Sequence, residues 1–156
     1  MNNSKPSILL SIKPIYAALI LSGRKTIELR KTFSKEFVNF RIYLYSTYPV
    51  RKIVGSVDIK SVESVSIDEI SANYIEKACV DEKTLYDYFK NNKTGIIIEV
   101  ENPLEFRKPI ELAQLRKMKH LPHNSHRKIH MNDEFEYFLT KIYSENLKHL
   151  NSKAIR

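Results

Sequence analysis

The order of strand-like and helix-like segments is the feature that most constrains the fold of this chain. Six segments are apolar or alternate with the period of a strand, but helical periodicity follows only the first and the fourth of them and marks the C-terminal end. A doubly wound sheet needs a helix between successive parallel strands, so this order argues against one. We therefore expect an α+β fold, a small and partly closed mixed β-barrel of about six strands with inserted helices and a C-terminal helix. The predicted strands are residues 7–12, 26–30, 40–46, 53–62, 96–100 and 106–112.

Proline and glycine residues mark the limits of these segments. Pro14 suits the first turn of a helix, and Gly23 suits the position just after its last turn, where left-handed backbone angles are needed. Gly55, inside the fourth strand, indicates a bulge, a barrel corner or the close approach of a ligand. Pro109 restricts the sixth strand to a sheet edge or a bulge. Further helices are predicted over residues 66–91 and 133–150, and a basic loop over residues 115–131.

The chain of 156 residues has the length of one ordinary domain and contains no repeat or linker-like tract. We expect a single domain over residues 1–156, with a core at 7–112 and the basic loop and C-terminal helix at 113–156. No segment approaches the ~20 apolar residues of a membrane span, and the N-terminal apolar run is too short for a signal peptide. Cys79 is the only cysteine, which excludes an intramolecular disulfide and favours a cytoplasmic location. No cofactor is expected.

The charge of the chain is unevenly distributed. Residues 1–60 carry 11 Lys and Arg against 3 acidic residues, residues 61–105 carry 4 against 10, and residues 106–156 carry 11 against 5. The total of +8 favours a polyanionic partner, RNA or a nucleotide. The alternative is a lysine-rich surface that only maintains solubility.

Residues 23–30, GRKTIELR, form the pattern G-x-K-x-x-E-x-R where a helix gives way to a strand. On a strand, Glu28 and Arg30 share one face and the aliphatic residues beside them take the other. Burial of the aliphatic face would place Glu28 and Arg30 next to Lys25. A carboxylate flanked by two cations can read a base edge and hold a phosphate. The alternative is an ion pair of Glu28 with either cation that only joins the helix to the sheet.

This pattern and its flanking segments, LSIKPIYAALILSG, IYLYSTYPVRKIVG and KTGIIIEV, resemble the ASCH family, a branch of the PUA-like barrels. The resemblance covers residues 7–112 and leaves out the C-terminal helix. It implies a PUA-like barrel and a polar cleft for RNA or a nucleotide around the pattern. We expect the cleft to include Lys13, Gly23, Lys25, Glu28, Arg30, Tyr45, Ser46, Ser125, His126 and Arg127.

Two of these positions carry alternatives that the sequence leaves open. Lys13 opens the first helix, where a cation is unfavourable for the helix dipole, so it is either simply exposed or part of the cleft. Tyr43 and Tyr45 lie on the polar face of their strand. A base can stack on such a ring, with Tyr45 preferred because Ser46 and Thr47 follow it, or both rings pack beneath a helix.

Four histidines, at positions 120, 123, 126 and 130, have a spacing that can supply zinc ligands. Lysines and arginines stand among them and repel a dication, so no metal is expected. The segment is either a basic loop that faces RNA or a solvated, partly packed loop. The resemblance aligns residues 122–127 with a P-x-Q-S-aromatic-R segment, which implies that the loop closes over the cleft with His126 in the place of the aromatic residue.

One branch of the family consists of amidohydrolases that remove acetyl from 4-acetylcytidine, with a lysine, a threonine three positions later and a distal glutamate as the catalytic set. Lys25 matches the lysine, but Glu28 stands at the threonine position. Ala78 stands at the glutamate position, and Glu76 is the nearest carboxylate. Acyl transfer needs an activated nucleophile and a positioned acid, so the sequence favours a binding module. The alternative is an enzyme on RNA or a modified nucleoside, a ribonuclease or an amidohydrolase-like protein, with Lys25 and Glu28 as catalytic candidates.

Overall fold

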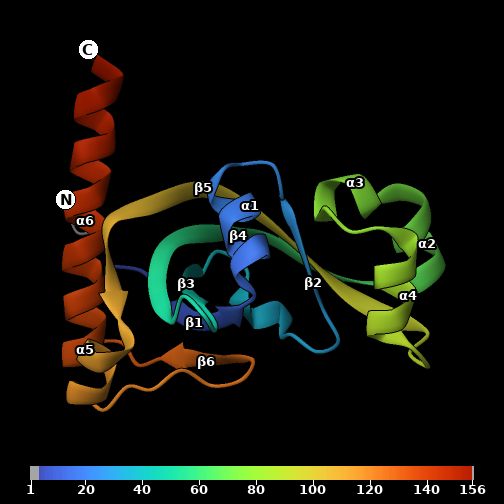
Figure 1. Ribbon diagram of the computed structural model, residues 1–156, viewed down its shortest axis with the longest axis horizontal. Helices are drawn as coiled ribbons and strands as arrows, with labels where there is room; N and C mark the ends of the chain where they lie inside the picture. The colour runs from blue at the N-terminus through green and yellow to red at the C-terminus, as the bar shows by residue number, and fades with distance from the viewer. Residues whose placement is uncertain (1–3, 156) are drawn as a thin grey trace.

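The computed structural model describes residues 4–155, and its six strands form one sheet (Figure 1). The strands are β1 (Ser7–Ile12), β2 (Ile27–Arg30), β3 (Arg41–Ser46), β4 (Lys52–Ser66), β5 (Thr94–Glu111) and β6 (His126–Ile129). Their order across the sheet is β2-β5-β4-β3-β1-β6. β1 and β3 are parallel, and every other neighbouring pair is antiparallel.

The two edges of this sheet are β2 and β6, and each pairs with a single neighbour within the described part of the chain. The predicted α+β class is therefore confirmed, and the strand number agrees, although two predicted strands are one strand in the structure and β6 was not predicted. The predicted barrel is wrong, because the sheet is open and does not close on itself. The sequence pattern indicates which segments are strands but does not indicate whether the first and last strands of the sheet meet.

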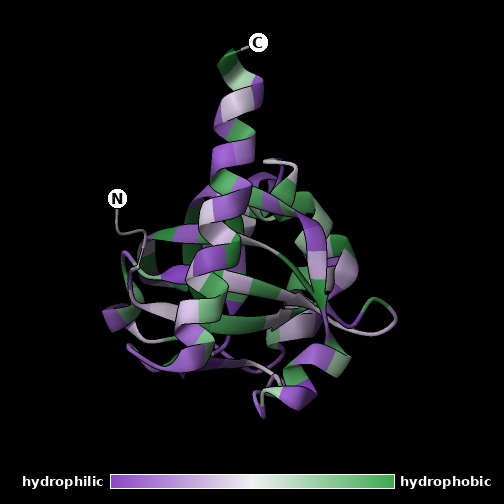
Figure 2. Cartoon of the chain, turned by 90° about the vertical axis from the view of Figure 1, so that its left-hand side faces the viewer, coloured by the Kyte–Doolittle hydropathy of each residue, from purple (hydrophilic) through white to green (hydrophobic). Residues whose placement is uncertain are grey.

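Helices lie over the middle of the sheet and at both of its ends (Figure 1). α1 crosses the middle, α2 to α4 gather beside β2, and α5 and α6 pack against the other end of β5. The C-terminal end of α6 projects beyond the rest of the molecule (Figure 2). The helices are α1 (Pro14–Leu21), the short 3-10 helix η1 (Lys35–Phe37), α2 (Ile67–Asn73), α3 (Ile75–Ala78), α4 (Glu82–Phe89), α5 (Leu112–Lys117) and α6 (Glu134–Ile155).

Local sequence signals explain where several of these helices begin and end. Pro14 occupies the first turn of α1, and Gly23 follows its end with φ of 82°, as predicted. The Ser66 side chain accepts a hydrogen bond from the amide of Glu69 and caps α2, and the Asp81 side chain caps α4 in the same way. The predicted helical region 66–91 is thus three short helices.

β4 and β5 are longer than the sequence indicated. The predicted strands 96–100 and 106–112 are two parts of β5, which continues through Asn102 at a φ of 55°. Gly55 of β4 lies at a register shift, and a Cβ atom there would collide with the Leu104 carbonyl and lie 2.7 Å from the Leu21 side chain. The predicted bulge is confirmed, and the close approach at Gly55 is that of β5 and α1, not of a ligand.

Pro109 lies where β5 has a neighbour on one side only. β2 pairs with β5 at residues 96–99, so the second half of β5 pairs with β4 alone. The register with β4 is irregular between Glu105 and Ile110, which brackets Pro109. The predicted edge or bulge at this proline is confirmed.

Three buried apolar clusters hold the layers together. The first packs α1 against β1, β3 and β4, the second packs α5 and α6 against the opposite face, and the third joins α2 to α4 with β2. Ile27 and Leu29 are buried in the third cluster, which leaves Glu28 and Arg30 on the other face of β2. The predicted alternation along residues 26–30 is confirmed.

The region 115–131, predicted to be a loop, contains two regular elements. α5 ends within it at Lys117, and β6 pairs with β1 as an antiparallel edge strand. β6 is four residues long and mostly basic, so neither its length nor its composition is typical of a strand. Its pairing with β1 supplies the structure that its own sequence does not specify.

Candidate functional site

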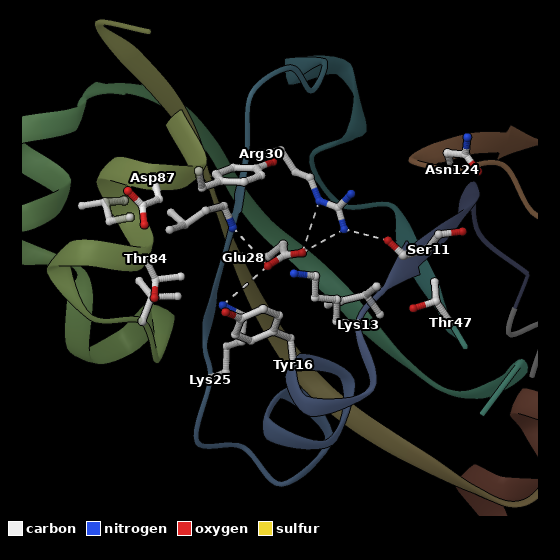
Figure 3. Close-up of a pocket in the computed structure, with 15 residues that line it drawn as sticks. Ser11, Lys13, Tyr16, Lys25, Glu28, Arg30, Thr47, Thr84, Asp87 and Asn124 are labelled. Carbon is white, nitrogen blue, oxygen red and sulfur yellow. Dashed lines mark hydrogen bonds and ion pairs between the residues drawn. The ribbon is translucent and has the colours of Figure 1, made fainter. Parts of the chain in front are cut away.

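A cavity of about 540 Å³ lies between α1, β2 and α4, next to the loop that precedes β6 (Figure 3). This volume is in the range of pockets for small organic ligands. Thr84 and Asp87 of α4 lie on one side of it, and Ser11, Thr47 and Asn124 lie on the other (Figure 3). The charged residues of the G-x-K-x-x-E-x-R pattern lie between these two groups.

The Glu28 carboxylate is held between two cations. Lys25 Nζ lies 3.5 Å from Glu28 Oε1, and Arg30 places its Nη2 atom 2.9 Å and its Nε atom 3.2 Å from Oε2. The amide of Leu29 also donates to Oε1, at 3.2 Å. Only 6% of Glu28 is exposed, so its charge is balanced by these groups and not by bulk water.

Lys25 is buried more deeply than its neighbours, with 2% of its surface exposed. Its ammonium donates a hydrogen bond to the carbonyl of Ala78 and lies 4.8 Å from the ring centroid of Tyr16. Burial lowers the pKa of Lys25 below that of an ordinary lysine, and the carboxylate of Glu28 opposes this shift. The strand pattern did not predict this burial, because Ala78 and Tyr16 come from α3 and α1.

Arg30 links the motif strand to the other side of the sheet. Its Nη2 atom donates to the carbonyl of Ser11 on β1, at 2.9 Å, although β1 and β2 are not paired strands. Ser11 in turn holds the loop before β6, because its hydroxyl donates to the His123 carbonyl and its amide donates to the Ser125 carbonyl at 2.8 Å. One residue therefore connects Arg30 with the rim of the cavity.

The surroundings shift the protonation of three rings near the cavity. Burial raises the pKa of Tyr16, and the charge of Glu28 adds to this effect. Burial likewise raises the pKa of Tyr88. At His126, burial and the nearby charge of Arg30 both lower the pKa, so that the neutral imidazole is favoured. The tyrosines therefore keep their protons and act as neutral hydrogen-bond donors at ordinary pH.

Four of the ten predicted cleft residues line the cavity, and the other six, three of them in the loop before β6 and at the start of β6, do not. Lys13, Lys25, Glu28 and Arg30 line it together. Gly23 ends α1 outside the cavity. Tyr45 and Ser46 are both buried, and the Tyr45 ring packs in the apolar cluster beneath α5 and α6. Tyr45 was expected either to stack on a base or to pack beneath a helix, and its position matches the second alternative.

The predicted loop residues separate in the structure. The Ser125 hydroxyl lies 3.0 Å from His126 Nδ1, and the His126 ring packs against Phe33 at 4.8 Å. Arg127 points away from the cavity, towards His120 and Phe135, with its guanidinium 3.1 Å from His120 Nδ1 and 5.7 Å from the Phe135 ring centroid. The loop was expected to close over the cleft, and Asn124 is the residue of this loop that lines the cavity.

Several cavity residues were not predicted. Tyr16 alone could have been predicted from the sequence. It lies three positions after Lys13, the N-cap residue of α1, and residues at this spacing lie on the same face of a helix. The others come from distant parts of the chain and become neighbours only in the fold. The unpredicted polar residues of the cavity are Ser11, Tyr16, Thr47, Thr84, Asp87 and Tyr88, whereas Asn124 belongs to the loop that was expected to close over the cleft.

The histidine-rich segment does not gather into a ligand set. His120 stacks on Phe135 at 4.3 Å, and His126 faces the phenylalanines of η1 and its flank. Among residues 4–155, no group of three or more His, Cys, Asp or Glu side chains is placed to hold a metal ion. In the same part of the chain, no helix has the length and apolar character to cross a bilayer.

One family model and several known proteins match this chain. The ASCH domain model matches residues 10–110. An ASCH domain-containing ribonuclease of Zymomonas mobilis is 27% identical over 112 residues, which span 70% of this chain and 74% of that protein. The crystal structure of ASCH from Zymomonas mobilis gives a TM-score of 0.78 at 23% identity and covers 85% of this chain and 93% of that one. A hypothetical protein from Leishmania major gives a TM-score of 0.57 at 11% identity, over 93% of this chain and 99% of that one.

Proposed function

Because the chain belongs to the ASCH domain family, we propose that it binds RNA or a nucleotide in the cavity around Lys25, Glu28 and Arg30. The observation that carries this proposal is the buried carboxylate held between two cations at a cavity of nucleotide-scale volume. A relative of this chain is named as a ribonuclease, which supports RNA as the ligand class. The net charge of +8 supports a polyanion as well.

Each member of the charged set has a role in this proposal. Arg30 and Lys13 contribute positive charge to the walls and attract a phosphate. Glu28 accepts hydrogen bonds from the amino or imino groups on a base edge, as carboxylates do for cytosine. Lys25 fixes the position of Glu28, and the neutral hydroxyl of Tyr16 adds a donor. The cavity thus offers separate groups for a phosphate and for a base.

Fluorescence anisotropy with a labelled RNA at several salt concentrations tests the proposal. If about three phosphates are neutralised, a single strand loses roughly 20-fold in affinity between about 50 mM and about 200 mM salt. Arg30→Ala is expected to weaken binding and to flatten this salt dependence. Lys60→Ala is a matched control, because Lys60 is 57% exposed in its side chain and pairs with Glu99 away from the cavity. Binding that is absent, or that salt does not change, contradicts the proposal.

A second candidate function is cleavage of the bound RNA. It is favoured by the name of the Zymomonas mobilis relative and by the lowered pKa of Lys25 beside the raised pKa of Tyr16. In such a reaction the base, Lys25 or Glu28, takes the proton of a 2′-hydroxyl, and the 2′ oxygen bonds to phosphorus. The bond from phosphorus to the 5′ oxygen breaks, and that oxygen receives a proton from an acid such as Tyr16.

Gel analysis of labelled RNA after incubation with the protein tests this candidate. Cleavage that Tyr16→Phe and Lys25→Met each reduce, while Lys60→Ala does not, supports it. Binding without any cleavage leaves the chain as a binding module.

A further inference from the structure

One exposed tyrosine lines the cavity and a second directly follows a residue that lines it, and each has a cation against its ring. Tyr88 of α4 lines the cavity with 40% of its surface exposed, and Lys31 Nζ lies 5.0 Å from its ring centroid. Tyr48 is 74% exposed, and the Arg51 guanidinium lies 5.0 Å from its centroid. Tyr48 directly follows Thr47, which lines the cavity on the side opposite α4 (Figure 3).

The backbone holds both tyrosines in place. The Thr47 carbonyl accepts hydrogen bonds from the amides of Val50 and Arg51, at 3.0 and 3.3 Å, and forms a tight turn around Tyr48. The Thr47 amide donates to the Ile12 carbonyl at 3.0 Å, which fastens this turn to the end of β1. Tyr88 is carried by a helix. Each ring is therefore attached to backbone whose position beside the cavity is held before a ligand arrives.

We infer that Tyr48 and Tyr88 are two base-stacking sites on either side of the cavity, used by a single RNA strand that crosses it. This inference rests on the proposed function. Binding of single strands combines aromatic rings, on which bases stack, with cations that follow the phosphates. Each tyrosine supplies the ring, and Arg51 or Lys31 supplies the cation beside it. The cavity then holds the nucleotide between the two stacked bases.

The distribution of tyrosines on the sheet supports the same path. Tyr43 and Tyr45 point into the apolar cluster beneath α5 and α6 and are buried, so they offer no ring to a base. The charge of Arg116 on α5 reaches Tyr45 together with that of Arg51. Arg51 and Arg116 therefore both contribute positive charge near Tyr45, which favours a polyanionic strand on this side of the sheet.

Anisotropy with a labelled oligoadenylate of about ten nucleotides, and calorimetry with AMP, test the inference. Tyr48→Ala and Tyr88→Ala are each expected to weaken oligonucleotide binding by roughly 5- to 150-fold, the range for loss of one stacked base. Tyr48→Phe and Tyr88→Phe retain wild-type affinity because they keep the ring. AMP, which fills the cavity alone, is expected to bind Tyr48→Ala as it binds the wild type. Tyr137→Ala is the matched control, since Tyr137 is 76% exposed on α6.

The outcomes separate the inference from the proposed function. If the wild type binds the oligonucleotide and both alanine variants bind it equally well, the stacking sites are overturned and the proposed function stands. If the wild type binds neither the oligonucleotide nor AMP, both are overturned. If a polyglutamate peptide binds with the affinity expected of RNA and loses it in the same variants, the surface serves an acidic protein and the inference is wrong. Thermal melting of each variant checks that it is folded.

Discussion

Two clusters of largely buried charge in this molecule differ in what lies beside them. The cavity cluster consists of Lys25, Glu28 and Arg30 and comes from six consecutive residues. The helix cluster consists of Arg41 and Asp58 on β3 and β4, with Lys5 beside Asp58 and Tyr143 of α6 against Arg41. The cavity cluster faces an open cavity, whereas the helix cluster is covered by a helix. The same kinds of charged groups therefore lie in two different surroundings.

The helix cluster ties α6 to the sheet. Arg41 lies 3.7 Å from Asp58 Oδ1, and its guanidinium stacks on Tyr143 of α6 at 3.4 Å from the ring centroid. Beside it, Glu136 of α6 accepts hydrogen bonds from Ser4 and from Thr140. These contacts join segments far apart in the chain. Their main consequence is stability, because Tyr143 of α6 covers the Arg41 guanidinium.

The comparison teaches that burial alone does not identify a functional charge. Both clusters contain a cation with about 5% of its surface exposed or less. Buried ion pairs are costly to desolvate, and removing one partner leaves the other unpaired. The cavity cluster leaves room for a ligand to take part in its pairing, and the helix cluster does not. The cavity is therefore the feature that distinguishes the candidate binding site from an anchor.

Arg41→Ala is expected to give the largest effect, on folding. It leaves Asp58 with Lys5 as a partner but removes the buried guanidinium that packs on Tyr143, so the free energy of unfolding should fall by about 2–3 kcal/mol. Urea denaturation measures this change. Lys60→Ala, at an exposed pair, should stay within about 0.5 kcal/mol. A loss of less than about 1 kcal/mol for Arg41→Ala would remove the distinction between the two clusters.

Lys25→Met should act mainly on binding. The loss of a charged hydrogen-bonding group is expected to weaken RNA affinity by roughly 10- to 150-fold. Methionine fills the space of the aliphatic stem, and Glu28 keeps Arg30 as a partner, so the free energy of unfolding should change by less than about 1 kcal/mol. Anisotropy and urea denaturation on the same preparation measure both quantities. Intact binding with a large loss of stability would make the cavity cluster an anchor like the helix cluster.

The pH dependence should show a smaller effect with opposite signs for binding and folding. The pKa of Lys25 is lowered in the folded protein, so between this pKa and the ordinary lysine value the unfolded chain binds more protons. The stability contributed by this group therefore rises as the pH rises through that window, while RNA affinity falls because the ammonium is lost. Lys25→Met should show neither change. Parallel trends for binding and folding would contradict this assignment of Lys25.

We expect no hydrolysis of 4-acetylcytidine by this protein. Glu28 is engaged by two cations and has no hydroxyl to offer, and the residue at the distal glutamate position is Ala78, whose carbonyl accepts from Lys25. Glu76 is exposed and does not line the cavity. Chromatographic detection of cytidine tests this expectation. Turnover of roughly 1 per second or faster, abolished by Lys25→Ala, would show that the cavity cluster is catalytic.

The sequence predicted those parts of the fold and site that depend on local periodicity. The alternation of Ile27 and Leu29 with Glu28 and Arg30 is enough to place the two charged residues on one face of β2. The pattern G-x-K-x-x-E-x-R indicated the family to which the chain belongs. Each of these signals lies within eight residues, and the structure agrees with them because local geometry decides them.

The remaining features depend on contacts that no local pattern encodes. Tyr45 was placed on a polar face, but both faces of the central sheet are covered, and alternation does not say which face is open. β6 is a strand only because it pairs with β1. The burial of Lys25 depends on Ala78, which is 53 positions away. The openness of the sheet follows from where β2 and β6 end in space, which a single sequence does not reveal.

The position of Ser11 has a consequence for how this protein tolerates mutation. Three of its groups make three links: the carbonyl accepts from Arg30, the amide donates to Ser125, and the hydroxyl donates to the His123 carbonyl. Two of these links use main-chain atoms of Ser11, which every residue but proline possesses. Evolutionary drift at position 11 therefore leaves the motif and the loop attached to β1 and removes at most one of the three links. The loop can diversify in sequence without losing its place beside the cavity.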